Sequence, residues 1–172
     1  MRRTILPVCL CFALAGAFAQ SETLERSATP AEIQGEWQLL PVADTFQPRV
    51  LKTNPWPAEC QWYSFGGSGE LSSTDKLKGP CDVLTSKQLH EAFAKTTAVV
   101  SWKYDFNPVY TKPLITVTRS DVGRYREYWD PQMVVKPFSK YGLDLRQGDL
   151  ILYLVDLKTH KRVLVRPLRR LP

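Results

Sequence analysis

Histidine is scarce in this 172-residue sequence, which contains only His90 and His160. A Ser-His-Asp centre needs a histidine as its base, and no serine stands in the Gly-x-Ser-x-Gly context of a nucleophile elbow. Neither histidine lies near a cysteine in sequence, so a zinc site lacks ligands. Glu127 and Asp130 would point to opposite faces of a strand, which separates their carboxylates. We therefore predict that the protein is not an enzyme and holds no metal or other cofactor.

The sequence also lacks a segment of about 20 apolar residues, the length that a membrane-spanning helix needs. Its apolar stretch Ile5–Phe18 follows Arg2 and Arg3 and ends beside the small residues Ala17 and Ala19. A positive start, an apolar centre and small residues at the cut are typical of a secretory signal peptide. A membrane anchor that stays attached is the alternative. We predict a cleaved signal peptide at residues 1–19 and a periplasmic or secreted mature protein without a transmembrane segment.

Removal of nineteen residues from 172 leaves 153, the size of one ordinary domain. We expect a flexible tail at residues 20–30 and a single domain at 31–172. The net charge falls from +6 to +4, because two arginines leave and no acidic residue does. Basic residues cluster only between Lys161 and Arg170. A nucleic-acid-binding protein would show a stronger basic stripe, so we predict no nucleic-acid partner. A solvated basic edge and weak attraction to an anionic membrane stay open as alternatives.

Only two of the four cysteines, Cys60 and Cys81, lie outside the predicted signal peptide. An even number of cysteines in an exported chain indicates a disulfide. Closing a loop of about 20 residues would stabilise the fold by roughly 3 kcal/mol in the chain-entropy treatment. A redox or metal-binding pair is the alternative, but it needs closer spacing or more ligands than this sequence has. We predict a Cys60–Cys81 disulfide.

Strand patterns dominate the sequence from residue 35 onward. The clearest one places Val100, Trp102, Tyr104 and Phe106 on one strand face and polar residues on the other. We expect a tight turn at the glycines of 66–69 and a long proline-rich loop at 44–59. The expected strands are Gly35–Leu40, Cys60–Phe65, Val100–Phe106, Leu114–Arg119, Arg124–Asp130, Met133–Phe138, Tyr141–Leu145, Leu150–Val155 and Arg162–Leu168. Successive hairpins predict a mainly all-β fold, an antiparallel up-and-down β-barrel of about eight to nine strands.

One segment, Leu84–Lys95, departs from the strand pattern and carries apolar residues at helical spacing. Thr85 and Gln88 match the capping box that begins many helices. We predict one short α-helix here, inserted before the third predicted strand. A shorter helical turn is expected at Thr29–Glu32, where a capping residue precedes a proline and an acidic residue.

The first predicted strand contains Gly35 and Trp37 after that short helical turn, and arginines follow in and after the last strand. This arrangement resembles the lipocalin-like (calycin) superfamily, in which a Gly-x-Trp motif opens the first strand of a barrel. The resemblance implies that Trp37 closes the base of the barrel beneath an arginine, for which Arg166, Arg169 and Arg170 are the candidates. A guanidinium stacked on an indole ring would contribute about 1–2 kcal/mol when desolvated.

The Gly-x-Trp motif, the export signal and the single disulfide also give a weaker resemblance to the bacterial alkaline protease inhibitors. These are small periplasmic barrels that inhibit metalloproteases. In that family the residues before the first strand enter the protease cleft. The resemblance implies that Gln20–Thr29 would contact a protease.

Aromatic residues are numerous in the predicted domain, with five tryptophans and seven tyrosines. Four of them, Trp102, Tyr104, Tyr125 and Trp129, lie on predicted strands and are candidates for the wall of a ligand pocket. The alternative is that these side chains only fill the core. We predict a lipocalin-like binding protein for a small hydrophobic or aromatic ligand. A periplasmic protein-interaction or protease-inhibitor module, with an envelope protein as partner and no small-molecule ligand, stays open as the alternative.

Overall fold

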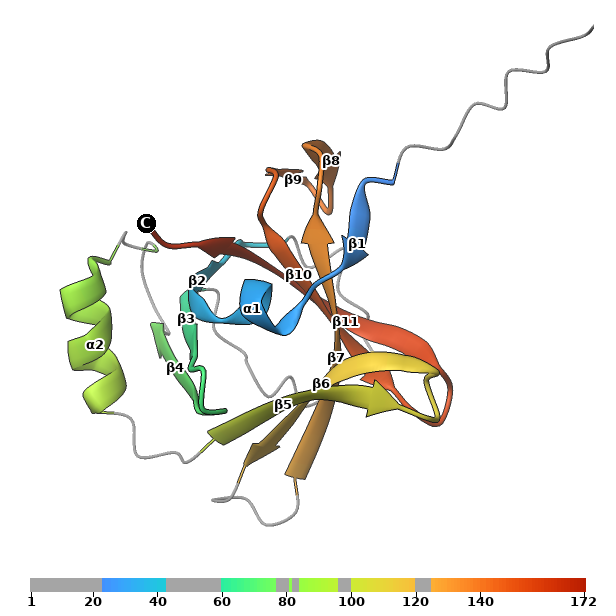
Figure 1. Ribbon diagram of the computed structural model, residues 1–172. Coiled ribbons are helices and arrows are strands. Elements are labelled where there is room, and N and C mark those ends of the chain that lie inside the picture. The colour runs from blue at the N-terminus through green and yellow to red at the C-terminus, as the bar shows by residue number, and fades with distance from the viewer. Residues whose placement is uncertain (1–22, 43–59, 77–80, 82–83, 96–99, 120–124) are drawn as a thin grey trace, which may run out of the picture.

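A computed structural model describes residues 23–42, 60–76, 81, 84–95, 100–119 and 125–172 (Figure 1). The predicted signal peptide and the whole of the predicted proline-rich loop at 44–59 lie outside these ranges. The described residues are mainly strand and include two short helices. The elements are β1 (Glu25–Ser27), α1 (Pro30–Ile33), β2 (Gly35–Leu39), β3 (Cys60–Phe65), β4 (Leu71–Lys76), α2 (Ser86–Ala94), β5 (Val100–Asn107), β6 (Lys112–Arg119), β7 (Tyr125–Val134), β8 (Phe138–Lys140), β9 (Leu143–Leu145), β10 (Leu150–Asp156) and β11 (Lys161–Arg170).

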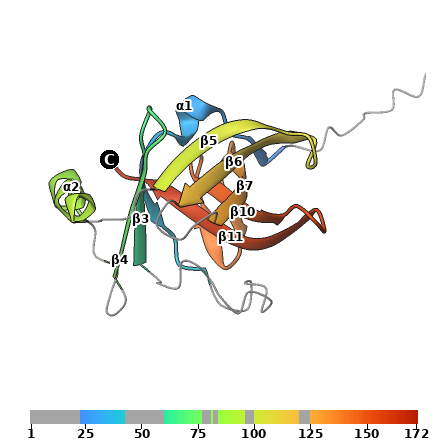
Figure 2. The same cartoon turned by 90° about the horizontal axis from the view of Figure 1, so that it is seen from below.

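Eight strands form one continuous antiparallel sheet in the order β4-β3-β2-β11-β10-β7-β6-β5, and β1 adds to β7. The sheet curls into a half-barrel, as the view from below shows (Figure 2). The prediction of a mainly β, antiparallel, curled sheet is therefore confirmed. The prediction of a closed barrel is wrong.

The barrel stays open because its edge strands β4 and β5 overlap at one end only in the described part of the chain. There Glu70 and Ser101 form an isolated antiparallel bridge, and the Trp102 amide donates to the Gly69 carbonyl over 2.8 Å. Beyond this point β4 and β5 run in opposite directions away from each other. A barrel needs a hydrogen-bonded ladder along its whole seam, and two strands that meet only at their ends cannot build one.

Two strands lie where the sequence pattern predicts none. β4 carries mostly polar side chains, so no apolar alternation marks it, yet it pairs with β3 along the whole of Cys60–Phe65. β1 lies inside the predicted flexible tail, where its three residues pair with Gln132–Val134 of β7. Both strands form because a partner strand offers an open edge, and the sequence of the segment itself does not report that partner.

Residues 125–134 form one strand, although the sequence pattern divides the region at Pro131. This proline lies where β7 changes its partner, since β6 pairs as far as Trp129 and β1 pairs from Gln132 onward. The Pro131 carbonyl accepts a hydrogen bond from the Ala28 amide over 3.1 Å. A proline has no N–H to give to a ladder, and at this junction none is required.

Both faces of the central strands are buried. On the concave face the strands contribute to one apolar core that includes Trp102 and Trp129. On the convex face the β8–β9 hairpin packs over a second cluster around Ile151 and Tyr153. β10 is therefore buried throughout Leu150–Val155, which explains why its sequence is apolar on both faces.

The short helix α1 closes one end of the concave core. Thr29 and Glu32 form its capping box, and Ile33 at its end is fully buried in the core. The Ile33 carbonyl accepts a hydrogen bond from the Trp37 indole nitrogen over 2.8 Å. α1 and the first residues of β2 are thereby fixed to each other.

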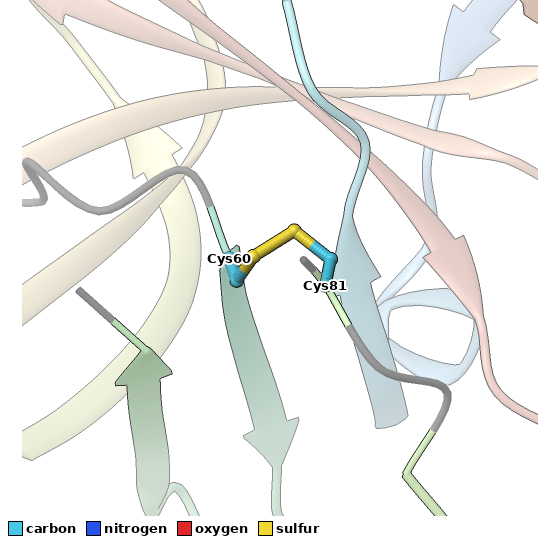
Figure 3. The surroundings of a disulfide bond; sticks show 2 residues. All are labelled: Cys60 and Cys81. Carbon is cyan, nitrogen blue, oxygen red and sulfur yellow. A yellow bond between two sulfur atoms is a disulfide. The ribbon is translucent and has the colours of Figure 1, made fainter. Parts of the chain in front are cut away.

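The helix α2 begins with the capping box of Thr85 and Gln88 that the sequence predicts, and its fully buried Leu89 packs against β3. The predicted disulfide between Cys60 and Cys81 is present, with 5.3 Å between the Cα atoms (Figure 3). α2 follows β4 and precedes β5, so more strands come before it than the sequence predicts, because β1 and β4 are not in the predicted set. Within the described ranges, neither helix has the length and apolar character needed to cross a bilayer.

Candidate functional site

Three of the four predicted ligand-binding aromatics lie on the concave face, but they do not line one space. Trp102 and Trp129 are buried in the core, and Tyr104 packs against its margin. The Tyr104 hydroxyl donates to the Ala28 carbonyl over 2.8 Å. The side chain of Tyr125, at the start of β7, is outside the described part of the structure. Of the three that are described, only Trp129 lines the cavity described below.

Trp102 is held in place as a packing residue. Its ring meets the Phe65 ring edge to face, with 5.4 Å between the centroids, and its indole nitrogen donates to the Gly66 carbonyl over 3.0 Å. Aromatic pairs of this geometry stabilise a core. Trp102 therefore anchors the end where β5 meets the β3–β4 turn.

The concave core contains a small, largely apolar cavity of about 20 Å³. A cavity of this size has room for about one water molecule, whereas ligand pockets usually measure some 300–1,000 Å³. Its lining is Tyr63, Phe65, Leu71, Ile115, Val117, Trp129, Leu152 and Arg166. At this place in the concave core, side chains therefore occupy the volume that a small-molecule ligand would need.

A buried polar cluster borders this cavity. The Gln61 side-chain oxygen accepts hydrogen bonds from the Tyr63 hydroxyl over 2.6 Å and from an Arg166 guanidinium nitrogen over 2.9 Å. Glu127 is also buried and accepts from the Trp129 indole nitrogen over 2.8 Å. Burial raises the pKa of Tyr63 to about 12 and lowers the pKa of Arg166 from its ordinary value. Tyr63 is thus a neutral hydrogen-bond donor at neutral pH.

The residues implied by the Gly-x-Trp motif come together at the end closed by α1. Arg170 is paired with Trp37 across β11 and β2, and its guanidinium carbon lies 4.4 Å from the ring centroid. Gly35 has a φ of +121°, and a Cβ atom there would lie 2.5 Å from an Arg170 nitrogen. This glycine is required both by its backbone conformation and by the closeness of the guanidinium.

Two of the arginines proposed for this role lie elsewhere, which corrects the prediction. Arg166 is on the concave face beside the cavity, four residues before Arg170. Arg169 points to the opposite face from Arg170 and forms an ion pair with Asp149 over 2.7 Å. Neighbouring residues of a strand alternate between faces, so only the register of β11 against β2 decides which arginine covers Trp37.

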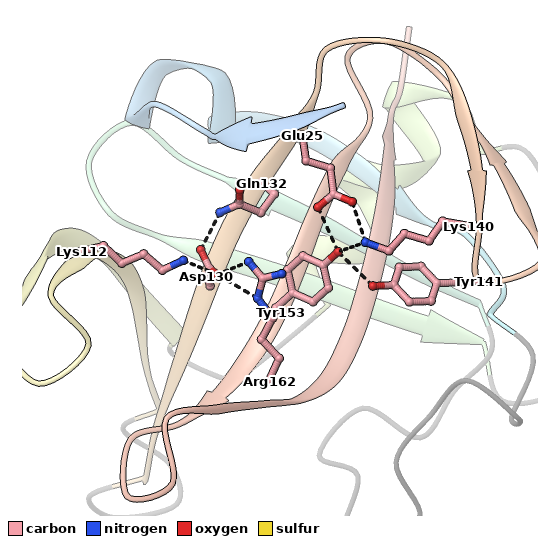
Figure 4. A network of polar contacts seen from close by, with 8 residues as sticks. All are labelled: Glu25, Lys112, Asp130, Gln132, Lys140, Tyr141, Tyr153 and Arg162. Carbon is pink, nitrogen blue, oxygen red and sulfur yellow. Dashed lines mark hydrogen bonds and ion pairs between the residues drawn. The ribbon is translucent and has the colours of Figure 1, made fainter. Parts of the chain in front are cut away.

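The convex face carries a polar network that the sequence pattern does not predict (Figure 4). At its centre is Asp130, whose carboxylate is 1% exposed. It accepts from Lys112 over 2.6 Å, from Arg162 over 2.6 Å and from the Gln132 amide over 2.7 Å. A buried charge is tolerated only when it is paired and hydrogen-bonded, and the three strands β6, β11 and β7 supply these partners through Lys112, Arg162 and Gln132.

A second centre of this network is the Tyr153 hydroxyl. It accepts from Lys140 over 3.0 Å and from the Tyr141 hydroxyl over 2.9 Å, and it donates to Glu25 over 3.1 Å. Burial and the Tyr141 hydrogen bond raise the pKa of Tyr153 well above its usual range. The Arg162 guanidinium lies 3.8 Å from the centroid of the Tyr153 ring and joins the two centres. The network holds β1 and the β8–β9 hairpin onto β10.

The remaining distinctive surface lies where the β5–β6 and β10–β11 hairpins turn, side by side in both views (Figures 1 and 2). Two of the large exposed apolar residues among the described residues, Phe106 and Val109, are on the first hairpin. The Tyr110 and His160 rings, one from each hairpin, have centroids 6.3 Å apart. The sequence pattern places Phe106 on the same strand face as the buried Trp102. Phe106 is nevertheless exposed, because β5 extends beyond the core.

No group of three or more histidine, cysteine or carboxylate side chains in the described ranges could hold a metal ion. No protein-family model matches this chain, and no curated protein or solved structure matches it either. Its function is therefore inferred from its own geometry.

Proposed function

We propose that this chain is an exported, non-enzymatic binding module that acts through its surface and carries no ligand in an interior pocket. The observation behind this proposal is the filled concave face, where aromatic side chains leave a cavity of only about 20 Å³ among the described residues. A lipocalin-like carrier needs a cavity more than ten times larger. The Cys60–Cys81 disulfide fits an oxidising compartment such as the periplasm or the exterior.

In this proposal the lipocalin-like resemblance concerns the fold and not the binding of a ligand. The contact of Arg170 with Trp37, beside Gly35 at the end covered by α1, supports this likeness. The open seam between β4 and β5 distinguishes this half-barrel from a closed ligand carrier. We infer a barrel-derived scaffold that serves to display a surface.

The protease-inhibitor alternative has less support, because it needs a free segment before the first strand. Glu25–Ser27 pair with β7, and Arg26 and Glu32 form an ion pair beside α1. The chain is thus fixed to the sheet from residue 25 onward. The end that carries Phe106 and Val109 offers an exposed apolar surface for binding.

A site-specific photocrosslinker at position 106 in the living source cell tests this function. A crosslinked product at 106, together with none at Lys87 on the exposed face of α2, is the expected result. Lys87 is a suitable control because α2 lies at the opposite end of the molecule (Figure 1). Equal crosslinking at both positions, or none at either, would contradict a role for this surface.

A second candidate is the binding of a small hydrophobic ligand at the cavity, favoured by its apolar wall and the adjacent Arg166. Trp129 lines this cavity and reports on it by its fluorescence. We expect no saturable quenching by a panel of fatty acids and aromatic probes, since Leu152 and Phe65 would first have to move. Saturable quenching that disappears in Leu152→Trp would establish the carrier function in place of the one proposed.

A further inference from the structure

The β5–β6 and β10–β11 hairpins together form one end of the molecule, which we name the hairpin end and define as residues 106–112 and 156–162. Tyr110 and His160 lie next to each other at 6.3 Å between ring centroids. Thr111 and His160 have φ values of +57° and +56°, the left-handed conformation that sharp turns use. The hairpin end is thus a narrow protrusion made of two adjoining turns, as Figures 1 and 2 show.

The centre of the hairpin end is apolar. Phe106 is 64% exposed and Val109 is 49% exposed, and the third large apolar side chain exposed among the described residues, Leu24, lies beside β1. A phenylalanine held in water at the tip of a hairpin contributes nothing to the core. Its removal from water would be favourable, so the free energy falls when this end of the hairpin enters an apolar medium.

Basic residues also lie in the hairpin end. Lys158 and Lys161 are exposed, and neither forms an ion pair with a described residue. Lys112 and Arg162 share the single buried carboxylate of Asp130, which leaves one positive charge in excess.

The carboxylates near the hairpin end offset this charge only in part. Asp105 is paired with Lys103 over 2.7 Å. Asp156 accepts from the Lys158 amide over 2.9 Å and from the Thr159 hydroxyl over 2.8 Å, and its negative charge also acts on Lys158. Asp130 is buried beneath Lys112 and Arg162. The outward-facing charge of the hairpin end is positive.

We propose that the hairpin end docks on an anionic lipid bilayer, with Phe106 and Val109 in the boundary between headgroups and acyl chains. This inference rests on the proposed surface-binding function and names its partner. Lys158, Lys161 and Arg162 then lie near the headgroups, and basic residues near an anionic surface are attracted to it. Interfacial binding combines buried apolar surface with this attraction.

The shape of the hairpin end favours a bilayer over a protein partner. A stable protein interface covers about 800 Å² on each side and has a broad apolar centre. Two turns with two exposed apolar side chains offer a point of insertion, which a fluid bilayer accommodates without a complementary surface. The exposed Lys158 and Lys161 of the hairpin end match negative headgroups of any arrangement.

Sedimentation with lipid vesicles tests this inference on the mature chain. The probes are vesicles of phosphatidylcholine alone and vesicles with about 30 mol % phosphatidylglycerol. We expect binding to the anionic vesicles only, and a decrease in binding as salt rises from about 50 to about 500 mM. F106S/V109S and K158E/K161E should each weaken binding by at least about tenfold.

Two matched variants serve as controls. K87E/K95E makes the same charge change on α2, at the opposite end of the molecule, and Leu24→Ser removes the exposed apolar side chain beside β1. Both should bind like the unaltered chain, and thermal unfolding followed by circular dichroism should show that all variants are folded. Equal losses in the control and hairpin variants, or binding to neutral vesicles as strong as to anionic ones, would overturn the inference.

A further reporter separates this inference from the proposed function. In Phe106→Trp, fluorescence quenched by brominated acyl chains would place position 106 within the bilayer. If anionic vesicles neither quench Trp fluorescence nor sediment the protein, the lipid partner is wrong. Crosslinking at position 106 to a protein would then leave the surface-binding function standing, whereas the absence of any crosslink would refute both.

Discussion

The guanidinium of Arg170 lies over the ring of fully buried Trp37, with 4.4 Å between the guanidinium carbon and the ring centroid. The two residues are direct partners in the β11–β2 pairing. Arg170 also donates to the Glu32 carbonyl in α1 over 2.6 Å. One side chain thereby links the last strand, the first long strand of the sheet and the helix that closes the core.

Replacement of Arg170 by glutamine should lower the free energy of unfolding by about 1–2 kcal/mol. Glutamine keeps much of the aliphatic stem but loses the cation–π contact and the charged hydrogen bond to α1. Urea unfolding of the folded chain measures this difference. Lys158→Gln, which removes an exposed positive charge elsewhere, should leave the stability unchanged within about 0.5 kcal/mol, and an equal loss in both variants would argue against the stacking contact.

Gly35→Ala should destabilise the protein by about 1–3 kcal/mol, since a φ of +121° strains any residue with a Cβ atom. The added methyl group also meets the Arg170 guanidinium. The double variant Gly35→Ala/Arg170→Ala separates the two effects, because it removes the clash and keeps the backbone strain. If the two single changes simply add, the methyl group and the guanidinium do not interfere.

Replacement of both Cys60 and Cys81 by serine should lower the free energy of unfolding by about 3 kcal/mol. The disulfide fixes the segment between β3 and α2, with the two cysteines 21 positions apart, and its loss enlarges the unfolded ensemble. Urea midpoints with and without a reducing agent provide the measurement. The reducing agent should shift the midpoint of the unaltered chain to that of the double serine variant and should not affect the variant.

Asp130→Asn should cost about 2 kcal/mol and loosen the convex face. The amide cannot accept charged hydrogen bonds as strongly as the carboxylate does, and Lys112 and Arg162 lose their shared counter-ion. Both cations are partly exposed and can be rehydrated, which keeps the loss below that of a fully buried pair. Amide hydrogen exchange in β6, β7 and β11 should accelerate more than in β3, and uniform acceleration would contradict a local role.

The stability of α1 should depend on pH through Glu32. Hydrogen bonds from Arg26, and then from the Thr29 amide, lower the pKa of this carboxyl group to about 2. A depressed pKa in the folded state means that the stabilisation is complete above the unfolded value near 4.5 and is lost as the pH falls toward 2. Since the pair is solvent-exposed, we expect less than about 1 kcal/mol.

Glu32→Gln provides the measurement, because glutamine preserves the capping box and removes the charge. The stability difference between the unaltered chain and this variant should shrink between about pH 5 and about pH 2. A difference that stays constant over this range would show that the carboxylate charge contributes nothing.

Local sequence relationships predict several elements correctly. Thr85 and Gln88 are three residues apart, so their capping box depends on the helix alone. The alternation of Val100, Trp102 and Tyr104 marks β5, because the side-chain period of a strand is a property of the backbone. The count of cysteines outside the predicted signal peptide leaves one disulfide pairing.

The sequence alone thus determined the strand-rich class, the capped helix, the disulfide and the glycine–tryptophan motif, because each follows from residue type or short-range spacing. Only the tertiary structure decided that Arg170 covers Trp37 and that Asp130 pairs with both Lys112 and Arg162. It also decided that the barrel stays open at the seam between β4 and β5. These outcomes depend on strand register, and a shift of one residue would turn every side chain to the opposite face. Register is fixed by the packing of strands distant in sequence, and no single segment encodes it.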